Sequence, residues 1–378
     1  MKLKSLVTGT LAFACASALS VGAAQAQTEV RATNWHPPKH PVVTGGYEPF
    51  VKHVEEISNG SLKIKLWSGG SLVKAKETLP GLQNGIADIG MLALSYFPAE
   101  FPYSQMIADF GMMSSDPLAA SAAVTEFVML QCQPCRDEFT KRDIVFTGVY
   151  STSPYTLISK GDYNSPEALA GKKFRSGGAL WNRWIASVDG TAINVPSSEM
   201  FETMDRGGVD IAIMSSASLS SFSLWDVASY NILTKLGTYQ VAATFALSKE
   251  FWADLNADQR KAILDGAALG NLGTTLDYMA LDEKALAQAK EKGVTVLEPS
   301  AELARQIQDF VAADLKTVAE TAKTKHGVAE PEKWIAAYRE LLTKWEGLMA
   351  QAGGDREKML QALRDEIFSK VDVNTYGL

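Results

Sequence analysis

The sequence has few of the residues that build metal centres and nucleic-acid interfaces. Its 378 residues include four histidines and three cysteines, and the formal net charge is −7. An acidic chain without lysine and arginine clusters is a poor binder of nucleic acids. His36 and His40 have the spacing of zinc ligands on a helix, but Pro37 and Pro38 lie between them and prevent that helix. We therefore expect no nucleic-acid partner and no histidine-based metal site.

Motifs of the common enzyme classes are also scarce. There is no Gly-x-Ser-x-Gly, no phosphate-binding loop and no dinucleotide fingerprint. Ser71 and Lys74 match the Ser-x-x-Lys of penicillin-recognising enzymes, but neither Ser-Asp-Asn nor Lys-Thr-Gly accompanies them. The absence of these motifs lowers the expectation of catalysis and does not exclude it. A periplasmic hydrolase that uses Ser71 and Lys74 stays an alternative.

Residues 1–26 have the pattern of a secretory signal peptide. Lys2 and Lys4 precede an apolar run that ends in Ala24-Gln25-Ala26, an Ala-x-Ala cleavage site. Cleavage after Ala26 changes the formal charge from −7 to −9, because it removes two lysines and no acidic residue. No later segment approaches the roughly 20 apolar residues of a transmembrane helix. We predict an exported protein that resides in the periplasm.

Cys132 and Cys135 form the sequence Cys-Gln-Pro-Cys. A thioredoxin-like redox pair belongs at a strand-to-helix turn. Here the pair follows the helical run Ala119–Leu130, which favours a structural disulfide in an oxidising compartment. The redox pair is the alternative.

The body of the chain alternates strand-like and helix-like segments. The strands have alternating or continuous apolar residues, and glycines end the intervening amphipathic helices. This alternation implies α/β architecture with mainly parallel sheets. The expected strands are Glu29–Trp35, Ser61–Trp67 and Asp88–Leu92, and the expected helices are Gly46–Ser58 and Lys74–Asn84.

One pattern occurs twice. The segment 84–91, in which Gly85 precedes Asp88 and an apolar strand, is echoed by 206–213, in which Gly207 precedes Asp210. Two copies so far apart indicate two similar lobes with a cleft between them, not a solenoid. A helical run that Asn256 caps, loosened by three glycines, extends towards Lys292 and is long enough to bridge both lobes. We assign residues 27–152 and 241–280 to lobe I, and residues 153–240 and 281–378, with the C-terminal helices, to lobe II.

Arg175 is the strongest candidate for a ligand-binding residue. A short strand is expected over Lys172–Arg175, and Gly177 and Gly178 free the backbone to turn after it. Open α/β sheets place ligands at the carboxyl ends of their strands. A guanidinium there can hold a carboxylate through two charge-assisted hydrogen bonds. The alternative is a surface arginine paired with a neighbouring acid.

Several longer motifs follow one another along the whole predicted mature chain. They are Trp35-His36-Pro37-Pro38-Lys39-His40-Pro41, Gly69-Gly70 with Lys76-Glu77-Thr78-Leu79, Leu82-Gln83-Asn84-Gly85 with Ala87-Asp88-Ile89-Gly90, Leu169-Ala170-Gly171-Lys172-Lys173-Phe174-Arg175, Pro196-Ser197-Ser198-Glu199-Met200-Phe201, Gly208-Val209-Asp210, and Ser248-Lys249-Glu250-Phe251-Trp252. In order and spacing the chain resembles the periplasmic solute-binding subunits of tripartite ATP-independent periplasmic (TRAP) transporters, the family of C4-dicarboxylate-binding proteins.

The resemblance implies a two-lobed periplasmic binding protein fold with crossing strands and a long bridging helix. It implies that the lobes close over one small organic acid, that Arg175 grips its carboxylate, and that the cargo passes to the integral membrane subunits of a TRAP transporter. An ABC-type binding protein shares the architecture and is a further alternative. Monomer and homodimer both stay open, as does a bridging Ca²⁺ or other cation, since oxygen ligands have no readable spacing here.

The chain departs from the family pattern at two places, and these affect the expected ligand. No second arginine lies around Tyr150–Ser153, and the asparagine that many members carry after the second Val-Asp is missing, so its contact is absent or has passed to Ser215 or Ser216. One arginine favours a monocarboxylate with an apolar, aromatic or hydroxylated tail over a dicarboxylate. Further candidates are the aromatic residues Trp35, Tyr96, Phe97, Tyr155 and Trp181, each of which could equally belong to the core. Glu77 could accept a hydrogen bond from a ligand hydroxyl or pair with a lysine. At Ser197 a small side chain would widen the pocket.

Overall fold

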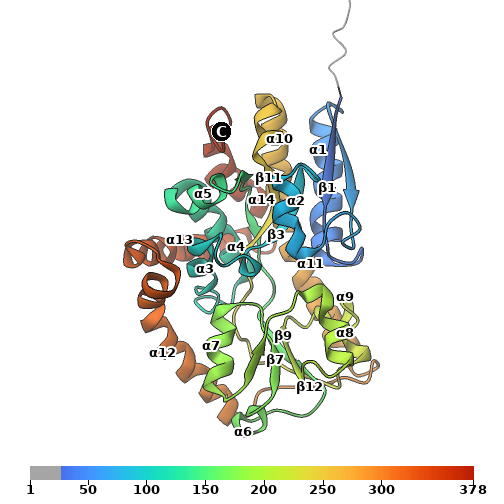
Figure 1. The fold of residues 1–378 in the computed structure, drawn as a ribbon, viewed down its shortest axis with the longest axis vertical. Coiled ribbons are helices and arrows are strands. Elements are labelled where there is room, and N and C mark those ends of the chain that lie inside the picture. Colours follow the sequence, from blue (N-terminus) through green and yellow to red (C-terminus); the bar gives the residue numbers. More distant parts are fainter. Residues whose placement is uncertain (1–26) are drawn as a thin grey trace, which may run out of the picture.

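The computed structural model describes residues 27–378, and the predicted signal peptide, residues 1–26, lies outside the described residues. Two six-stranded sheets form the centres of two α/β lobes, one above the other in Figure 1. No helix in the described part of the chain combines the length and apolar character that crossing a membrane requires.

The first sheet has the strand order β2-β1-β3-β11-β4, and β5 also pairs with β11. Its strands are β1 (Thr28–Thr33), β2 (Leu62–Trp67), β3 (Ile89–Ala93), β4 (Ile144–Val145), β5 (Val149–Tyr150) and β11 (Ala242–Ser248). The helical segments of this part of the chain are η1 (Val42–Tyr47), α1 (Glu48–Ile57), η2 (Ala75–Glu77), α2 (Thr78–Gln83), η3 (Leu94–Tyr96), α3 (Pro102–Ala108), α4 (Pro117–Glu126), η4 (Phe127–Gln131), α5 (Gln133–Thr140) and α10 (Lys249–Asp254).

The second sheet has the order β12-β10-β6-β9-β7-β8. Its strands are β6 (Thr156–Ser159), β7 (Lys173–Arg175), β8 (Thr191–Ile193), β9 (Ile211–Met214), β10 (Tyr230–Ile232) and β12 (Thr295–Leu297). The helical segments are α6 (Pro166–Leu169), α7 (Ala179–Ser187), η5 (Ser197–Glu199), α8 (Met200–Asp205), α9 (Ser218–Ser221) and η6 (Leu224–Asp226). After β12 the chain continues through α12 (Ala301–His326), α13 (Pro331–Ala352), α14 (Arg356–Glu366) and η7 (Phe368–Lys370).

The two sheets repeat one unit. β1 pairs in parallel with β2 and β3, as β7 does with β8 and β9. The repeated aspartates hold these units together in the same way, because Asp88 accepts a hydrogen bond from the backbone of Arg31 at 2.7 Å and Asp210 one from Lys173 at 2.9 Å. The sheets are mixed, not mainly parallel: β11 and β6, each entering from the other lobe, pair antiparallel with β3 and β9.

Four segments connect the lobes. Residues 151–155 lead from β5 to β6 and residues 233–241 from β10 to β11, and the two segments are hydrogen-bonded to each other through Thr152 to Tyr239 and Tyr155 to Gly237. The long helix α11 (Ala257–Ala289) contacts β5 and β11 of the first sheet as well as α9 and β12 of the second lobe, and α12 contacts both α3 and α7. Asn256 caps α11 through the backbone of Gln259, as expected.

The glycines of α11 do not loosen the helix. They are packing positions, because a Cβ on Gly273 would clash with the carbonyl oxygen of Gly45 in η1, one on Gly270 with the ring of Phe245, and one on Gly266 with Val54. Close approach of two backbones requires residues without side chains.

The C-terminal helices lie elsewhere than the sequence suggests. The assignment from the sequence places all of 281–378 with the second lobe, whereas α13 and α14 contact α4 and α11 beside the first sheet. Lys344 of α13 pairs with Glu126 of α4 at 2.9 Å, and the Trp345 ring nitrogen donates to the same carboxylate at 2.7 Å. An amphipathic pattern shows that a helix face is buried, but not against which lobe.

Cys132 and Cys135 are joined by a disulfide. Cys132 lies between η4 and α5, where its sulfur accepts the backbone N–H of Cys135. The pair thus connects two helical segments and does not follow a strand, in agreement with the structural role that the sequence favours.

Candidate functional site

A cavity of about 30 Å³ lies where the two lobes and the connecting segments meet. Its walls come from both lobes, and eight of the lining residues carry rings: Trp35, His36, Tyr96, Tyr150, Tyr155, Phe222, Tyr239 and Tyr278. The remaining lining residues are Arg175, four hydroxyl residues and three apolar ones: Thr152, Ser197, Ser215, Ser218, Met91, Ala93 and Met214. No carboxylate from residues 27–378 lines this cavity.

Arg175 is the last residue of β7 and is 3% exposed. Its Nε donates to the carbonyl oxygen of Val195 at 3.3 Å and its Nη2 to the hydroxyl of Tyr96 at 3.2 Å. Among residues 27–378, no acidic side chain lies within ion-pair distance of this guanidinium. A buried charge without a partner is costly, so this arrangement calls for an anion from outside the chain.

Tyr96 joins the lobes at the cavity. It ends η3, which follows β3 of the first sheet, and its hydroxyl oxygen accepts hydrogen bonds from Arg175 and from the backbone N–H of Ser197 at 3.0 Å. Both donors belong to the second lobe. Separation of the lobes would therefore break these two bonds.

Four more tyrosines surround the cavity. The rings of Tyr150 and Tyr278 stack at 5.4 Å, and those of Tyr155 and Tyr239 lie nearly parallel at 6.5 Å. Burial raises the pKa of all four hydroxyls, so they stay neutral. They add hydrogen-bonding groups and flat apolar walls without adding negative charge.

His36 lines the cavity and His40 stacks on it from outside the lining, and the two residues do not form a helix. Their rings stack with a centroid distance of 4.0 Å, and the ring of Trp35 stacks on the other face of His36 at a centroid distance of 3.7 Å. Burial lowers the pKa of His40 to about 3, and burial together with His40 lowers that of His36 well below its ordinary value. Both imidazoles are therefore neutral. Across residues 27–378, no group of three or more potential metal-ligating side chains occurs.

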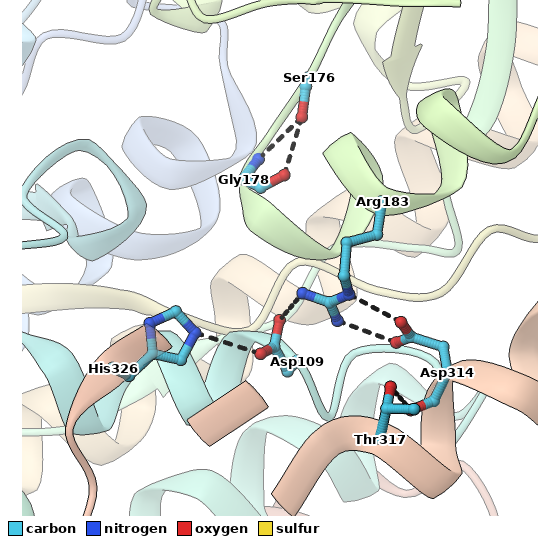
Figure 2. A network of polar contacts seen from close by, with 7 residues as sticks. All are labelled: Asp109, Ser176, Gly178, Arg183, Asp314, Thr317 and His326. Atoms are coloured by element: carbon cyan, nitrogen blue, oxygen red, sulfur yellow. Dashed lines mark hydrogen bonds and ion pairs between the residues drawn. The ribbon is translucent and has the colours of Figure 1, made fainter. Parts of the chain in front are cut away.

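A second arginine follows Arg175 closely but has a different environment. Arg183 of α7 makes a bidentate pair with Asp314 of α12 at 2.7 and 2.9 Å and a third bond with Asp109, next to α3, at 2.9 Å. His326 lies 3.3 Å from the other oxygen of Asp109. Figure 2 shows Asp109 between the imidazole and the guanidinium. This network ties α7 to α3 and α12, away from the cavity.

The structure brings six of the ten predicted site residues to the cavity: Arg175, Trp35, Tyr96, Tyr155, Ser197 and Ser215. Four lie elsewhere. Trp181 packs behind Tyr155 at 4.9 Å and donates to the carbonyl of Leu236, and Phe97 is part of the core. Ser216 accepts a hydrogen bond from Asn231.

Glu77 is the fourth residue outside the cavity. It is exposed, and its carboxylate accepts the backbone N–H of Lys74 at 3.3 Å in the turn before α2. Ser71 is exposed as well and donates to the carbonyl of Ser68 at 2.8 Å. Within residues 27–378 no hydrogen bond joins Ser71 to Lys74, so the pair lacks the contact that would activate a serine.

Sequence reasoning missed most of the tyrosines and His36. Tyr150, Tyr239 and Tyr278 each lie within two residues of a predicted lobe boundary, at 152/153, 240/241 and 280/281. Since a cleft between two lobes is lined by the segments that cross it, aromatic residues beside those boundaries would have been found by this criterion. His36 follows Trp35 in the sequence, but it was considered only as a metal ligand.

The comparisons with known proteins agree on one family. A model of bacterial extracellular solute-binding proteins, family 7, matches residues 32–322. A solute-binding protein of Albidiferax ferrireducens is 25% identical over 235 residues, which are 62% of this chain and 66% of that protein, just under two thirds. One of Chromohalobacter salexigens is 20% identical over 308 residues, 77% of this chain and 84% of that protein.

Solved structures have the same two-lobed fold. A marine metagenome TRAP solute-binding protein specific for aromatic acid ligands, in complex with 3-hydroxybenzoate, superposes with a TM-score of 0.75 at 17% identity, covering 85% of this chain and 99% of that one. A TRAP periplasmic solute-binding protein of Bordetella bronchiseptica with bound (R)- and (S)-mandelate gives a TM-score of 0.72 at 17% identity, covering 84% and 99%. The chain therefore belongs to family 7 of the bacterial extracellular solute-binding proteins.

Proposed function

We propose that this protein binds an organic monocarboxylate between its lobes and that Arg175 holds the carboxylate. The observation that carries the proposal is the buried guanidinium of Arg175, which lines the cavity and has no acidic partner among residues 27–378. A carboxylate would give it the bidentate, charge-assisted bonds for which its geometry is suited.

The charge of the cavity favours one carboxylate over two. Among residues 27–378, Arg175 is the one cation that lines it, because no lysine or acid takes part and burial keeps His36 and four of the lining tyrosines neutral. The position where a second arginine was sought holds Tyr150 and Thr152. The aromatic walls fit a flat or apolar tail. The related structures named above hold mandelate and 3-hydroxybenzoate, which are aromatic monocarboxylates.

Ligand entry requires the lobes to move. A cavity of about 30 Å³ has roughly the volume of one water molecule, far less than an organic acid. The bonds that Tyr96 accepts from Arg175 and Ser197 hold the lobes together at this point. We propose that they open when the lobes separate and that the carboxylate takes the place of the Tyr96 hydroxyl on Arg175. Binding would then select a closed state with the acid inside.

The proposal includes export and delivery. Residues 1–26 would direct the chain to the periplasm and be removed there, and the loaded protein would pass its acid to the integral membrane subunits of a TRAP transporter. Binding without turnover is expected, and monomer and homodimer both fit this role.

A thermal-shift screen tests the function. The purified protein is melted with monocarboxylates, dicarboxylates, 2-oxo acids, sulfonates and sugar acids. A ligand that binds only the folded state adds about 2.7 kcal/mol of stability at a hundredfold excess over its dissociation constant. We expect a large shift with a monocarboxylate class and unchanged ligand after recovery. A shift with dicarboxylates alone would contradict the one-arginine argument, and no shift with any acid would contradict the proposed function.

A further inference from the structure

His36 of the cavity wall and His40, which stacks on it, have hydrogen-bond partners that fix their tautomers. The side-chain oxygen of Asn34 accepts the backbone N–H of His36 at 2.8 Å, so the atom at this position is the oxygen and not the amide nitrogen. The same oxygen lies 2.9 Å from Nδ1 of His36. Because a carbonyl oxygen can only accept, the proton of the neutral His36 ring is on Nδ1, and Nε2 carries a lone pair.

His40 has the opposite tautomer. Its Nδ1 accepts the backbone N–H of Val42 at 3.2 Å, so its proton is on Nε2, which lies 3.1 Å from the hydroxyl oxygen of Tyr278. Both nitrogens of His40 are thereby used inside the protein. His36 differs, because within residues 27–378 no group forms a hydrogen bond with its Nε2.

The stacking determines how His36 meets the cavity. Trp35 and His40 cover the ring at centroid distances of 3.7 and 4.0 Å, so His36 contributes its edge, and not a face, to the lining. Nδ1 is occupied by Asn34, and the free edge therefore holds Nε2. Burial keeps the ring neutral, so this nitrogen remains an acceptor across the physiological pH range.

We infer that His36 determines ligand specificity: its Nε2 accepts a hydrogen bond from a hydroxyl group of the bound acid, so that the ligand is a hydroxylated monocarboxylate. The inference rests on the proposed function and narrows its ligand class. In a closed cavity without bulk water, an acceptor that finds no donor is penalised, whereas a ligand hydroxyl satisfies it. Sites that hydrogen-bond a hydroxyl discriminate strongly against the analogue without one.

Matched ligand pairs test the inference by calorimetry. The pairs are (R)- and (S)-mandelate against phenylacetate, and 3-hydroxybenzoate against benzoate, which differ only in the hydroxyl. We expect the hydroxylated acid of at least one pair to bind the wild-type protein roughly tenfold or more tightly. In His36→Phe, which keeps a stacked ring and removes the acceptor, the preference should fall to within about twofold while the unsubstituted acid still binds.

The control is His53→Phe, which replaces a histidine of α1 that pairs with Asp265 outside the cavity. It should retain the full hydroxyl preference. Equal affinities within both pairs in the wild type, or a preference that survives His36→Phe, would overturn the inference and leave the proposed function intact. Failure of every acid to bind the wild type would overturn both.

A measurement on the wild-type protein does not depend on how the variant folds. Long-range ¹⁵N NMR of the imidazoles reports which nitrogen carries the proton. We expect a protonated Nδ1 and an unprotonated Nε2 in His36, with a change at Nε2 when the hydroxylated acid is added but not with its unsubstituted partner. A proton on Nε2 of the free protein would overturn the inference.

Discussion

Two arginines of the second lobe, the buried Arg175 and the partly buried Arg183, lie eight residues apart and have opposite environments. Arg183 meets two carboxylates, Asp109 and Asp314, through three hydrogen bonds. Arg175 meets the backbone carbonyls of Val195 and Ile213 and a tyrosine hydroxyl, all neutral, and lines the cavity. The same residue type is thus structural where the chain supplies the counter-charge and available for a ligand where it does not.

Removal of the paired arginine should have the largest effect. Arg183→Ala removes the guanidinium from the buried carboxylates of Asp109 and Asp314, and within residues 27–378 only Asp109 keeps another contact, to His326; this costs about 3 kcal/mol or more of the free energy of unfolding. Urea denaturation of the two proteins measures this difference. Arg175→Ala is the matched control and should change the free energy of unfolding by less than about 1 kcal/mol, since no acid is left unpaired. Equal losses of unfolding free energy in Arg183→Ala and Arg175→Ala would contradict the different roles of the two arginines.

The unpaired arginine should instead control binding. Arg175→Ala is expected to weaken binding of the acid found in the screen about 100-fold, or about 2.7 kcal/mol, because the carboxylate loses its charge-assisted bonds. Titration calorimetry measures the dissociation constant. Arg175→Lys keeps the positive charge but loses the planar guanidinium that bonds a carboxylate through two nitrogens, so its dissociation constant should lie between those of the wild type and Arg175→Ala. Unchanged affinity in Arg175→Ala would show that the carboxylate binds elsewhere.

Asp282 extends the comparison to carboxylates. It lies on α11 without an ion-pair partner among residues 27–378, accepts the backbone N–H of Ala217 at 2.6 Å, and its burial raises the pKa from 3.8 to about 6. A carboxyl group whose pKa is raised in the folded state binds its proton more tightly there than in the unfolded state. The protein therefore gains stability as the pH falls through about 6, and the gain is complete below 3.8. Relative to Asp282→Asn, the wild type should gain about 1 kcal/mol between pH 7 and 5. Urea denaturation of both proteins at pH 7 and pH 5 measures this gain. An equal change in the free energy of unfolding of the wild type and the variant between these pH values would contradict the raised pKa.

The smallest effect is expected at Glu77. Its carboxylate is exposed and bonds the backbone of Lys74, not the cavity. Glu77→Ala should alter the dissociation constant less than twofold, since exposed contacts contribute little. Calorimetry beside Arg175→Ala checks this directly. A loss comparable with that of the arginine variant would mean that Glu77 reaches the ligand in another arrangement of the lobes.

Local patterns predicted the position of Arg175 and the repeated unit. β7 ends at Arg175, and Gly178 lies in the turn that leads into α7 with a φ of 159°. A short strand followed by glycines can be recognised from adjacent residues alone, so its end was predictable. The similarity between segments 84–91 and 206–213 corresponds to equivalent hydrogen bonds from Asp88 and Asp210. Both features depend on contacts within one unit.

The walls of the cavity depend on contacts between distant segments. Trp181 and Tyr155 look alike as candidates, but the Trp181 ring turns to the carbonyl of Leu236 while Tyr155 reaches the cavity. Periodicity indicates that an aromatic residue is buried and does not indicate what it faces. The same limit applies to α13 and α14, whose apolar faces predict burial but not the lobe on which they pack.

A crystal structure with the acid that gives the largest thermal shift would show where the carboxylate binds. We expect it on the guanidinium of Arg175 with N···O distances of about 2.7–2.9 Å. Arg183 should keep its bonds to Asp109 and Asp314 in that structure. A carboxylate bound at any other site, with Arg175 still bonded to Val195 and Tyr96, would show that Arg175 is not the residue that holds the ligand.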